Sequence, residues 1–296
     1  MFKKFDPNLA VLLSTLLWGT YWIPLRYIDS AADGSVWLNA TSFFILFLIL
    51  SPIFLKNIKT LIKSDNAYQL KSNFFAALAM VLYSEALLRV DIAHAVLFFY
   101  LAPSWGTILG RIYLGNPITL KRIIAIIIGF TGLIIVLGVD DGVFYPQEIG
   151  DIMALLSGVS WALSSTYFNL AKKTPVFNKI AFTSFFMVLL FIFLAIFPEG
   201  RNFSFSSDMI NEITIIWMLA FALIWLLPSI ALVYYSVQIL DPGRLNILLT
   251  FEVIVGLFSA ALLTSEVIGL SVIVGAILII MSGTIDIVIK DKAIKQ

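Results

Sequence analysis

The segments LLSTLLW (residues 12–18) and LLSGVSW (residues 155–161) share the pattern Leu-Leu-Ser-x-x-x-Trp at a spacing of 143 residues. A second pair, YLAPSWGTILGRIYLGNPIT (100–119) and TFEVIVGLFSAALLTSEVIG (250–269), aligns at a spacing of 150 residues, and places Gly106 on Gly256. Because the two matches follow the same order at nearly equal spacing, they predict an internal repeat. We expect the first repeat in residues 1–145 and the second in residues 146–296.

Ten apolar stretches divide the chain, each close to the ~20 residues that ~30 Å of hydrocarbon requires of a helix. Hydrophobic residues make up 60% of the chain, above the ~45–50% usual for soluble domains. We therefore predict an all-α integral membrane protein with ten transmembrane helices. Five crossings per repeat orient the two repeats oppositely, and inverted repeats are typical of transporters with a substrate site near mid-membrane. The stretches are 8–28, 36–55, 73–89, 94–113, 121–138, 150–170, 179–197, 214–236, 244–263 and 267–289.

The distribution of basic residues predicts the orientation of these crossings. Sixteen of the nineteen lysines and arginines fall on the side of the two termini, and only Arg26, Arg89 and Arg201 fall on the other. Loops rich in lysine and arginine stay in the cytoplasm. The pattern predicts a multi-pass protein of the inner or plasma membrane with both termini cytoplasmic.

Composition also limits the classes of function. The chain has no cysteine and a single histidine, His94, which leaves no thiolate or histidine cluster for a metal. We expect no cofactor, and the scattered basic residues indicate no nucleic-acid partner. A membrane sensor normally carries a soluble domain, and an intramembrane enzyme needs a recognisable nucleophile and base. Neither feature is evident, and both classes are kept as alternatives to transport.

One face of the first stretch carries polar and aromatic residues at helical spacing. Ser14 is followed there by Trp18, Tyr21, Trp22 and Arg26, a pattern that indicates the wall of a cavity. Ordinary packing by serine and an interfacial belt of tryptophan are the alternatives. We expect a small-molecule substrate to contact these aromatic and charged residues, together with Trp161 of the second repeat and with Tyr83 and Tyr100.

Ionisable residues inside a bilayer are costly and normally face protein or a cavity. Glu252, in the ninth stretch, and Glu85, in the third, meet this description. Glu252 is a candidate for substrate binding and for carrying a coupling proton, or it holds adjacent helices together. Glu85 is likewise a candidate for substrate binding. It lies four residues before Arg89, so the alternative is that these two side chains neutralise each other.

Prolines interrupt three of the stretches. Pro24, Pro103 and Pro228 lie in the first, fourth and eighth, and each removes a backbone hydrogen bond from its helix. They are candidate hinges or static bends.

The chain resembles the EamA branch of the drug/metabolite transporter superfamily along nearly its whole length. The similar motifs are Trp18-Gly19, Leu101-Ala102-Pro103, Leu114-Gly115-Asn116-Pro117-Ile118-Thr119, Gly150-Asp151, Phe251-Glu252-Val253 and Ser265-Glu266. The resemblance implies two inverted five-helix repeats that move small organic solutes by alternating access. Asn116, Val253 and Glu85 depart from the family pattern.

The chemistry of the substrate stays open at this point. Aromatic rings with buried carboxylates suit an organic cation, an ammonium compound or an amino acid. Arg26 and Arg89 instead suit a carboxylate, and a zwitterion would use both kinds of group. The lipid bilayer is the expected surrounding of the chain, and its oligomeric state is open.

Overall fold

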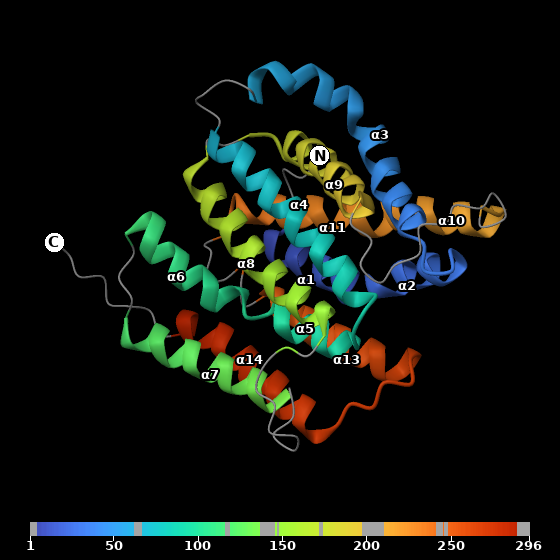
Figure 1. Cartoon of the computed structure of the whole chain (residues 1–296). Coiled ribbons are helices and arrows are strands. Elements are labelled where there is room, and N and C mark those ends of the chain that lie inside the picture. Colours follow the sequence, from blue (N-terminus) through green and yellow to red (C-terminus); the bar gives the residue numbers. More distant parts are fainter. Residues whose placement is uncertain are drawn as a thin grey trace.

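A computed structural model describes residues 5–61, 67–115, 119–136, 146, 148–171, 174–196, 210–240, 245 and 248–288. Every element in these ranges is a helix, as expected for an all-α protein, and the helices form one bundle (Figure 1). The first half contains α1 (Pro7–Gly19), α2 (Trp22–Ala31), α3 (Val36–Leu61), α4 (Ala67–Leu87), α5 (Ile92–Phe99), α6 (Ala102–Leu114) and α7 (Leu120–Val136). The second contains α8 (Ile149–Leu170), α9 (Val176–Ile196), α10 (Glu212–Ala220), the π-helix η4 (Phe221–Leu226), α11 (Leu227–Val237), α13 (Phe251–Leu263) and α14 (Leu270–Val288).

Five helical stretches are long and apolar enough to cross a membrane. They are Pro7–Ala31, Asn39–Lys59, Ile92–Leu114, Val176–Leu194 and Glu212–Val237, with shorter apolar helices at Ile123–Ile135, Phe251–Leu263 and Leu270–Ser282. Helices α4 and α8 are not in this set, because polar residues such as Ser72 and Ser164 make them less apolar. These two serines are buried where α4 packs on α8, and the hydroxyl of each donates to the backbone carbonyl of the other. The number of ten crossings stays a prediction.

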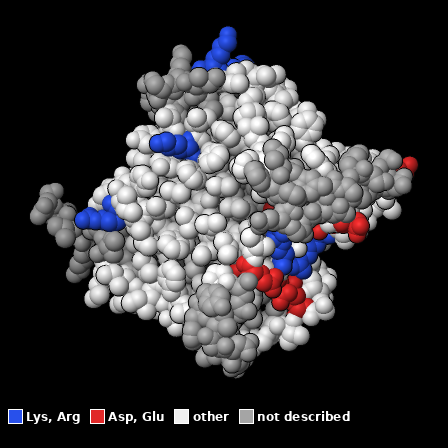
Figure 2. All heavy atoms as spheres, viewed as in Figure 1, with Lys and Arg blue, Asp and Glu red and all other residues white. Residues whose placement is uncertain are grey.

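The outer surface is mostly uncharged. On the face in Figure 2, the charged side chains of the described residues form a few small groups, and the rest of the described surface is uncharged. Large apolar side chains are exposed on the molecule, including Phe258 at 66%, Val267 at 89% and Leu270 at 77%. Such exposure is disfavoured in water and favourable in hydrocarbon, so the surface suits a lipid environment.

Helix packing follows the pattern of a repeat related by two-fold symmetry. Helix α4 packs along α8, and the repeat counterparts of these two helices, α11 and α1, also pack together. Helix α6 contacts α8, and likewise α13 contacts α1. The counterparts α3 and α9 contact each other, and so do α7 and α14, which lie side by side at one edge of the bundle (Figure 1).

Helices are interrupted close to all three prolines singled out above. Pro24 has no N–H to donate to the Thr20 carbonyl, and the helix is interrupted nearby, between the end of α1 and the start of α2. Pro103 similarly leaves the Phe99 carbonyl without its helical donor, and α5 ends there. Pro228 follows η4, where the helix widens to π geometry.

The freed carbonyl of Phe99 lies against Gly158 of α8. A Cβ atom built on Gly158 would lie 2.7 Å from this oxygen, closer than van der Waals contact permits. Helix α8 therefore approaches the α5–α6 break only because residue 158 has no side chain.

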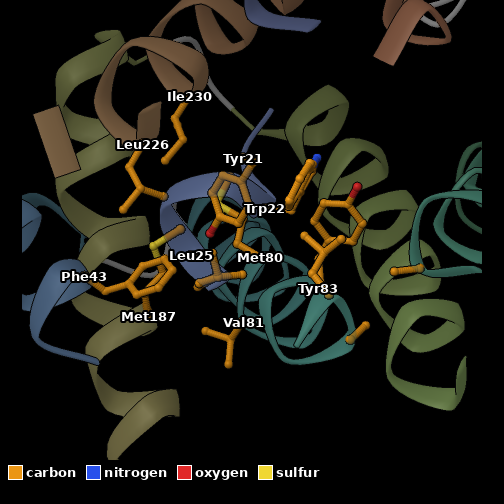
Figure 3. Packing of buried hydrophobic residues seen from close by; sticks show 14 of the residues in the cluster. Tyr21, Trp22, Leu25, Phe43, Met80, Val81, Tyr83, Met187, Leu226 and Ile230 are labelled. Atoms are coloured by element: carbon orange, nitrogen blue, oxygen red, sulfur yellow. The ribbon is translucent and has the colours of Figure 1, made fainter. Parts of the chain in front are cut away.

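The core of the bundle is apolar and aromatic (Figure 3). Tyr21 of the α1–α2 break is 1% exposed and packs edge-on against Phe221, with ring centroids 4.9 Å apart. Its hydroxyl lies 2.8 Å from the Ser84 hydroxyl, which satisfies both groups in the interior.

Candidate functional site

A cavity lies in the bundle where helices of the two halves meet. Its empty volume is about 820 Å³ when the open space at its mouth is included. Helices α1, α4, α5, α6, α8, α11 and α13 contribute to its wall. The lining residues are Trp18, Ala79, Met80, Tyr83, Phe99, Tyr100, Ala102, Gly106, Trp161, Ala162, Ser165, Val233, Leu249 and Glu252.

Glu252 supplies the charge of this lining. Its side chain is 4% exposed, and both carboxylate oxygens accept hydrogen bonds from tyrosine. The Tyr83 hydroxyl donates to Oε1 at 3.2 Å, and the Tyr100 hydroxyl donates to Oε2 at 2.7 Å. The Tyr100 oxygen also lies 2.6 Å from the Leu249 carbonyl. The carboxylate is thus held between helices of both halves of the chain.

The sequence suggested that Glu252 lies near the centre of a continuous ninth helix. In the structure α13 begins at Phe251, so Glu252 lies in its first turn. The amide end of a helix carries a partial positive charge, which favours a carboxylate there. Helix α6 begins at Ala102, the residue that the repeat aligns with Glu252. Each repeat therefore starts a helix at the same place beside the cavity.

Aromatic rings form much of the remaining wall. Tyr83 and Phe99 pack with ring centroids 4.9 Å apart, and Phe99 meets Tyr100 edge-on at 5.3 Å. Trp18 and Trp161, the tryptophans that end the two matching segments, both line the cavity. The structure thus brings together Trp18, Tyr83, Tyr100, Trp161 and Glu252 of the nine residues expected to bind substrate.

The other four expected residues do not line this cavity. Tyr21 belongs to the core described above, and the Trp22 indole donates to the Ser259 hydroxyl at 3.0 Å. Arg26 and Glu85 are engaged in ion pairs. A contact of any of the four with substrate stays a prediction from the sequence.

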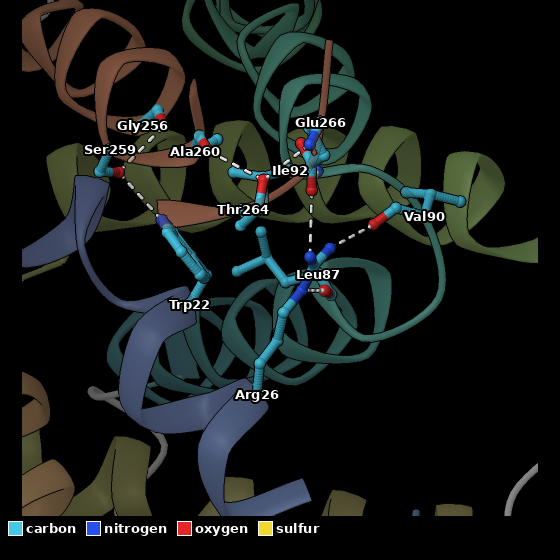
Figure 4. Close-up of polar contacts among 10 residues, drawn as sticks. All are labelled: Trp22, Arg26, Leu87, Val90, Ile92, Gly256, Ser259, Ala260, Thr264 and Glu266. Carbon is cyan, nitrogen blue, oxygen red and sulfur yellow. Dashed lines mark hydrogen bonds and ion pairs between the residues drawn. The ribbon is translucent and has the colours of Figure 1, made fainter. Parts of the chain in front are cut away.

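Arg26 joins three segments that are distant in sequence, an arrangement we call the Arg26 clasp (Figure 4). Its guanidinium donates to Glu266 Oε1 at 3.0 Å, to the Leu87 carbonyl at 2.8 Å and to the Val90 carbonyl at 2.7 Å. The Ile92 amide donates to both oxygens of Glu266, at 3.1 and 3.0 Å. The clasp therefore ties α2 to the α4–α5 connection and to the segment between α13 and α14.

A further ion pair and a histidine–aspartate contact lie at the same end of the bundle. Arg89 bonds Glu85 at 3.0 Å, with the Glu85 side chain 2% exposed, so the mutual neutralisation that the sequence left open does occur. His94 Nδ1 lies 3.4 Å from Asp151 in the first turn of α8. On α8 the cavity lining begins at Trp161, about three turns further along the helix. The cavity is thus displaced from the Arg26 end of the bundle.

Sequence reasoning missed the small and aliphatic residues of the wall, such as Ala79, Ala162 and Val233. Residues of this kind occur throughout membrane helices, so no local pattern distinguishes them. Phe99 could have been predicted from the sequence as a lining residue, because it precedes Tyr100 and its carbonyl is the one that Pro103 leaves without a donor. Asn116, noted as a departure from the family pattern, lies outside the described residues.

Comparison with known proteins places this geometry in context. The model of the EamA-like transporter family matches residues 7–138 and again residues 148–285. One crystal structure of a protein 16% identical aligns with a TM-score of 0.60 over 98% of both chains, which shows the shared fold. No curated protein sequence matches the chain.

Proposed function

The chain belongs to the EamA-like transporter family, and on this premise we propose that it is a secondary transporter of a small polar or amphiphilic metabolite. The central cavity is the substrate site, and transport proceeds by alternating access. The observation that carries the proposal is the position of Glu252 in an aromatic cavity whose walls come from both repeats. A site between two repeats is reached from either face when one repeat rocks against the other.

In this proposal the Arg26 clasp closes the route from one face. The clasp, the Arg89–Glu85 ion pair and the His94–Asp151 contact connect the ends of α2, α4, α5 and α8. The distribution of basic residues places this end away from the cytoplasm. The described conformation then corresponds to a carrier closed on the external side, and opening there requires the clasp to separate.

The test is transport by purified protein in liposomes. A thermal-shift screen of metabolites first identifies a compound that stabilises the folded protein, and counterflow then measures its movement across the vesicle membrane. We expect saturable counterflow that is weakened by Trp161→Ala and retained by Trp217→Ala, because Trp217 packs against Tyr27 outside the cavity. A ligand that binds in the cavity and never crosses the membrane would contradict the proposal.

Coupling to protons forms a separate part of the proposal. Glu252 is the carboxylate of the lining, and a group that gains and loses a proton as the cavity alternates would couple transport to a pH gradient. If this is its sole role, Glu252→Gln retains substrate exchange and loses accumulation driven by pH. If the folded Glu252→Gln variant still accumulates substrate under a pH gradient, a residue other than Glu252 carries the coupling proton.

A further inference from the structure

We propose, on the basis of the function above, that the cavity selects an organic monocation whose charged nitrogen rests against Glu252. The ligand class is a primary to quaternary ammonium compound with a small apolar body. The sequence alone favoured an organic cation or an amino acid and left an anion open. The positions of the charged side chains in the structure separate these three classes.

The first argument is the balance of charge around the cavity. Glu252 contributes a carboxylate, and none of the residues that line the cavity in the described part of the chain is a lysine or arginine. The two arginines that would suit a substrate carboxylate are engaged at the Arg26 end, Arg26 with Glu266 and Arg89 with Glu85. A carboxylate entering the cavity would meet one charge of its own sign and no opposite charge, which is costly in a poorly hydrated site.

The second argument is the aromatic character of the wall. Trp18, Phe99 and Trp161 line the cavity together with the two tyrosines that hold Glu252. Faces of tryptophan, tyrosine and phenylalanine attract ammonium groups, most strongly where water is excluded. A cation therefore gains from the rings and from the carboxylate, whereas an uncharged compound of the same shape gains only from apolar contact.

The third argument is the capacity of Glu252 to accept more hydrogen bonds. A carboxylate has about four acceptor positions, and the hydroxyls of Tyr83 and Tyr100 use one on each oxygen. The N–H of a primary, secondary or tertiary ammonium ligand therefore has a position to occupy without displacing either tyrosine, whereas a quaternary ammonium group meets the carboxylate through charge alone. Tyr83 and Tyr100 act as positioning residues, and one carboxylate in the lining matches one positive charge on the ligand.

The experiment compares ligands that differ in charge and little in shape. One series is tyramine, tyrosine and 4-hydroxyphenylacetate, which are a cation, a zwitterion and an anion. The other is choline, its uncharged carbon analogue 3,3-dimethyl-1-butanol and glycine betaine. Binding to the detergent-purified full chain is measured by thermal shift and calorimetry. We expect at least one cation to bind, and to bind roughly 10-fold to 100-fold more tightly than the other members of its series.

Two variants assign the preference to Glu252. Glu252→Gln should abolish the preference for the cation within each series, and Glu212→Gln should keep it, because Glu212 is an exposed acid in the first turn of α10. Tyr100→Phe should weaken cation binding by a smaller factor, since one of two tyrosine donors to the carboxylate is removed. The series measured on the unmodified protein test the proposal even if Glu252→Gln does not fold.

The proposal is overturned if an uncharged, zwitterionic or anionic member binds as tightly as its cation. It is also overturned if no cation binds at millimolar concentration, or if folded Glu252→Gln keeps the cation preference. Failure of the transport function has a different signature: cations bind with the expected preference and show no counterflow in liposomes. Counterflow of an anion or an uncharged compound that is independent of Glu252 would instead refute the cation class and leave transport standing.

Discussion

Replacement of Arg26 by glutamine should open the cavity toward the Arg26 end of the bundle. The substitution removes three donated hydrogen bonds, to Glu266 and to the carbonyls of Leu87 and Val90. Glu266 keeps the Ile92 amide as a partner. The clasp then loses its connection to α2, while the connection between Glu266 and the start of α5 persists.

The size of the effect follows from these contacts. Hydrogen bonds to charged groups contribute ~1.5–3 kcal/mol each when they are shielded from water. The Arg26 side chain is 32% exposed, so water replaces a large part of this energy, and we take about 2–3 kcal/mol for the whole substitution. That energy corresponds to roughly a 30-fold to 150-fold change in an equilibrium. A closed form that outnumbers the open form by about 100 to 1 would become comparable to it.

Cysteine labelling measures this change directly, because the chain has no cysteine of its own. Ser165→Cys places a thiol in the wall of the cavity, and a membrane-impermeant maleimide is applied from the Arg26 face of oriented vesicles. Labelling should be at least ~10-fold faster with Arg26→Gln. The matched control is Arg111→Gln at the opposite end of the bundle, where the guanidinium donates to the Gly115 carbonyl at 3.4 Å.

Equal labelling rates with and without Arg26→Gln, in protein shown to be folded, would refute the reasoning. The clasp would then be a static brace, and the external route would be closed by other contacts. Faster labelling in the Arg111→Gln control would also contradict the proposal that the Arg26 clasp keeps this side of the cavity closed, because the effect would not be specific to the clasp.

Two further predictions concern orientation and binding. Single cysteines at Lys59 and Glu212, both exposed, should be labelled from opposite faces of the membrane, Lys59 from the cytoplasm; labelling of both from one face would exclude the predicted topology. Trp18→Ala and Trp161→Ala should each weaken ligand binding by roughly 5-fold to 30-fold, as expected for ~1–2 kcal/mol of aromatic contact, and Trp217→Ala should leave it within about 2-fold. Similar losses in all three folded variants, measured by calorimetry, would remove the distinction between cavity and core tryptophans.

The sequence alone was sufficient for the helical class and the family. Apolar stretches of membrane length and the two matched segments are local features, and the family match over residues 7–138 and 148–285 confirmed the resemblance. Pro24 and Pro103 also marked two places where a helix is interrupted, because a missing N–H is a property of the residue itself. The sequence also pointed to three residues that line the cavity. The internal repeat singled out Trp18 and Trp161, and the cost of a charge inside a bilayer singled out Glu252.

Tertiary structure decided which polar residues lie together. A continuous first helix would place Trp18, Tyr21 and Arg26 on one face. In the structure the rings of Trp18 and Tyr21 still stack, with centroids 5.2 Å apart, but only Trp18 lines the cavity and Tyr21 is buried in the core. Arg26 meets Glu266, 240 residues away, and this pairing holds its guanidinium away from the cavity lining. Helical periodicity describes only neighbours along the chain, whereas the partner of a charged side chain depends on how distant helices pack. For that reason the chemical character of the cavity followed from the packing and not from the sequence.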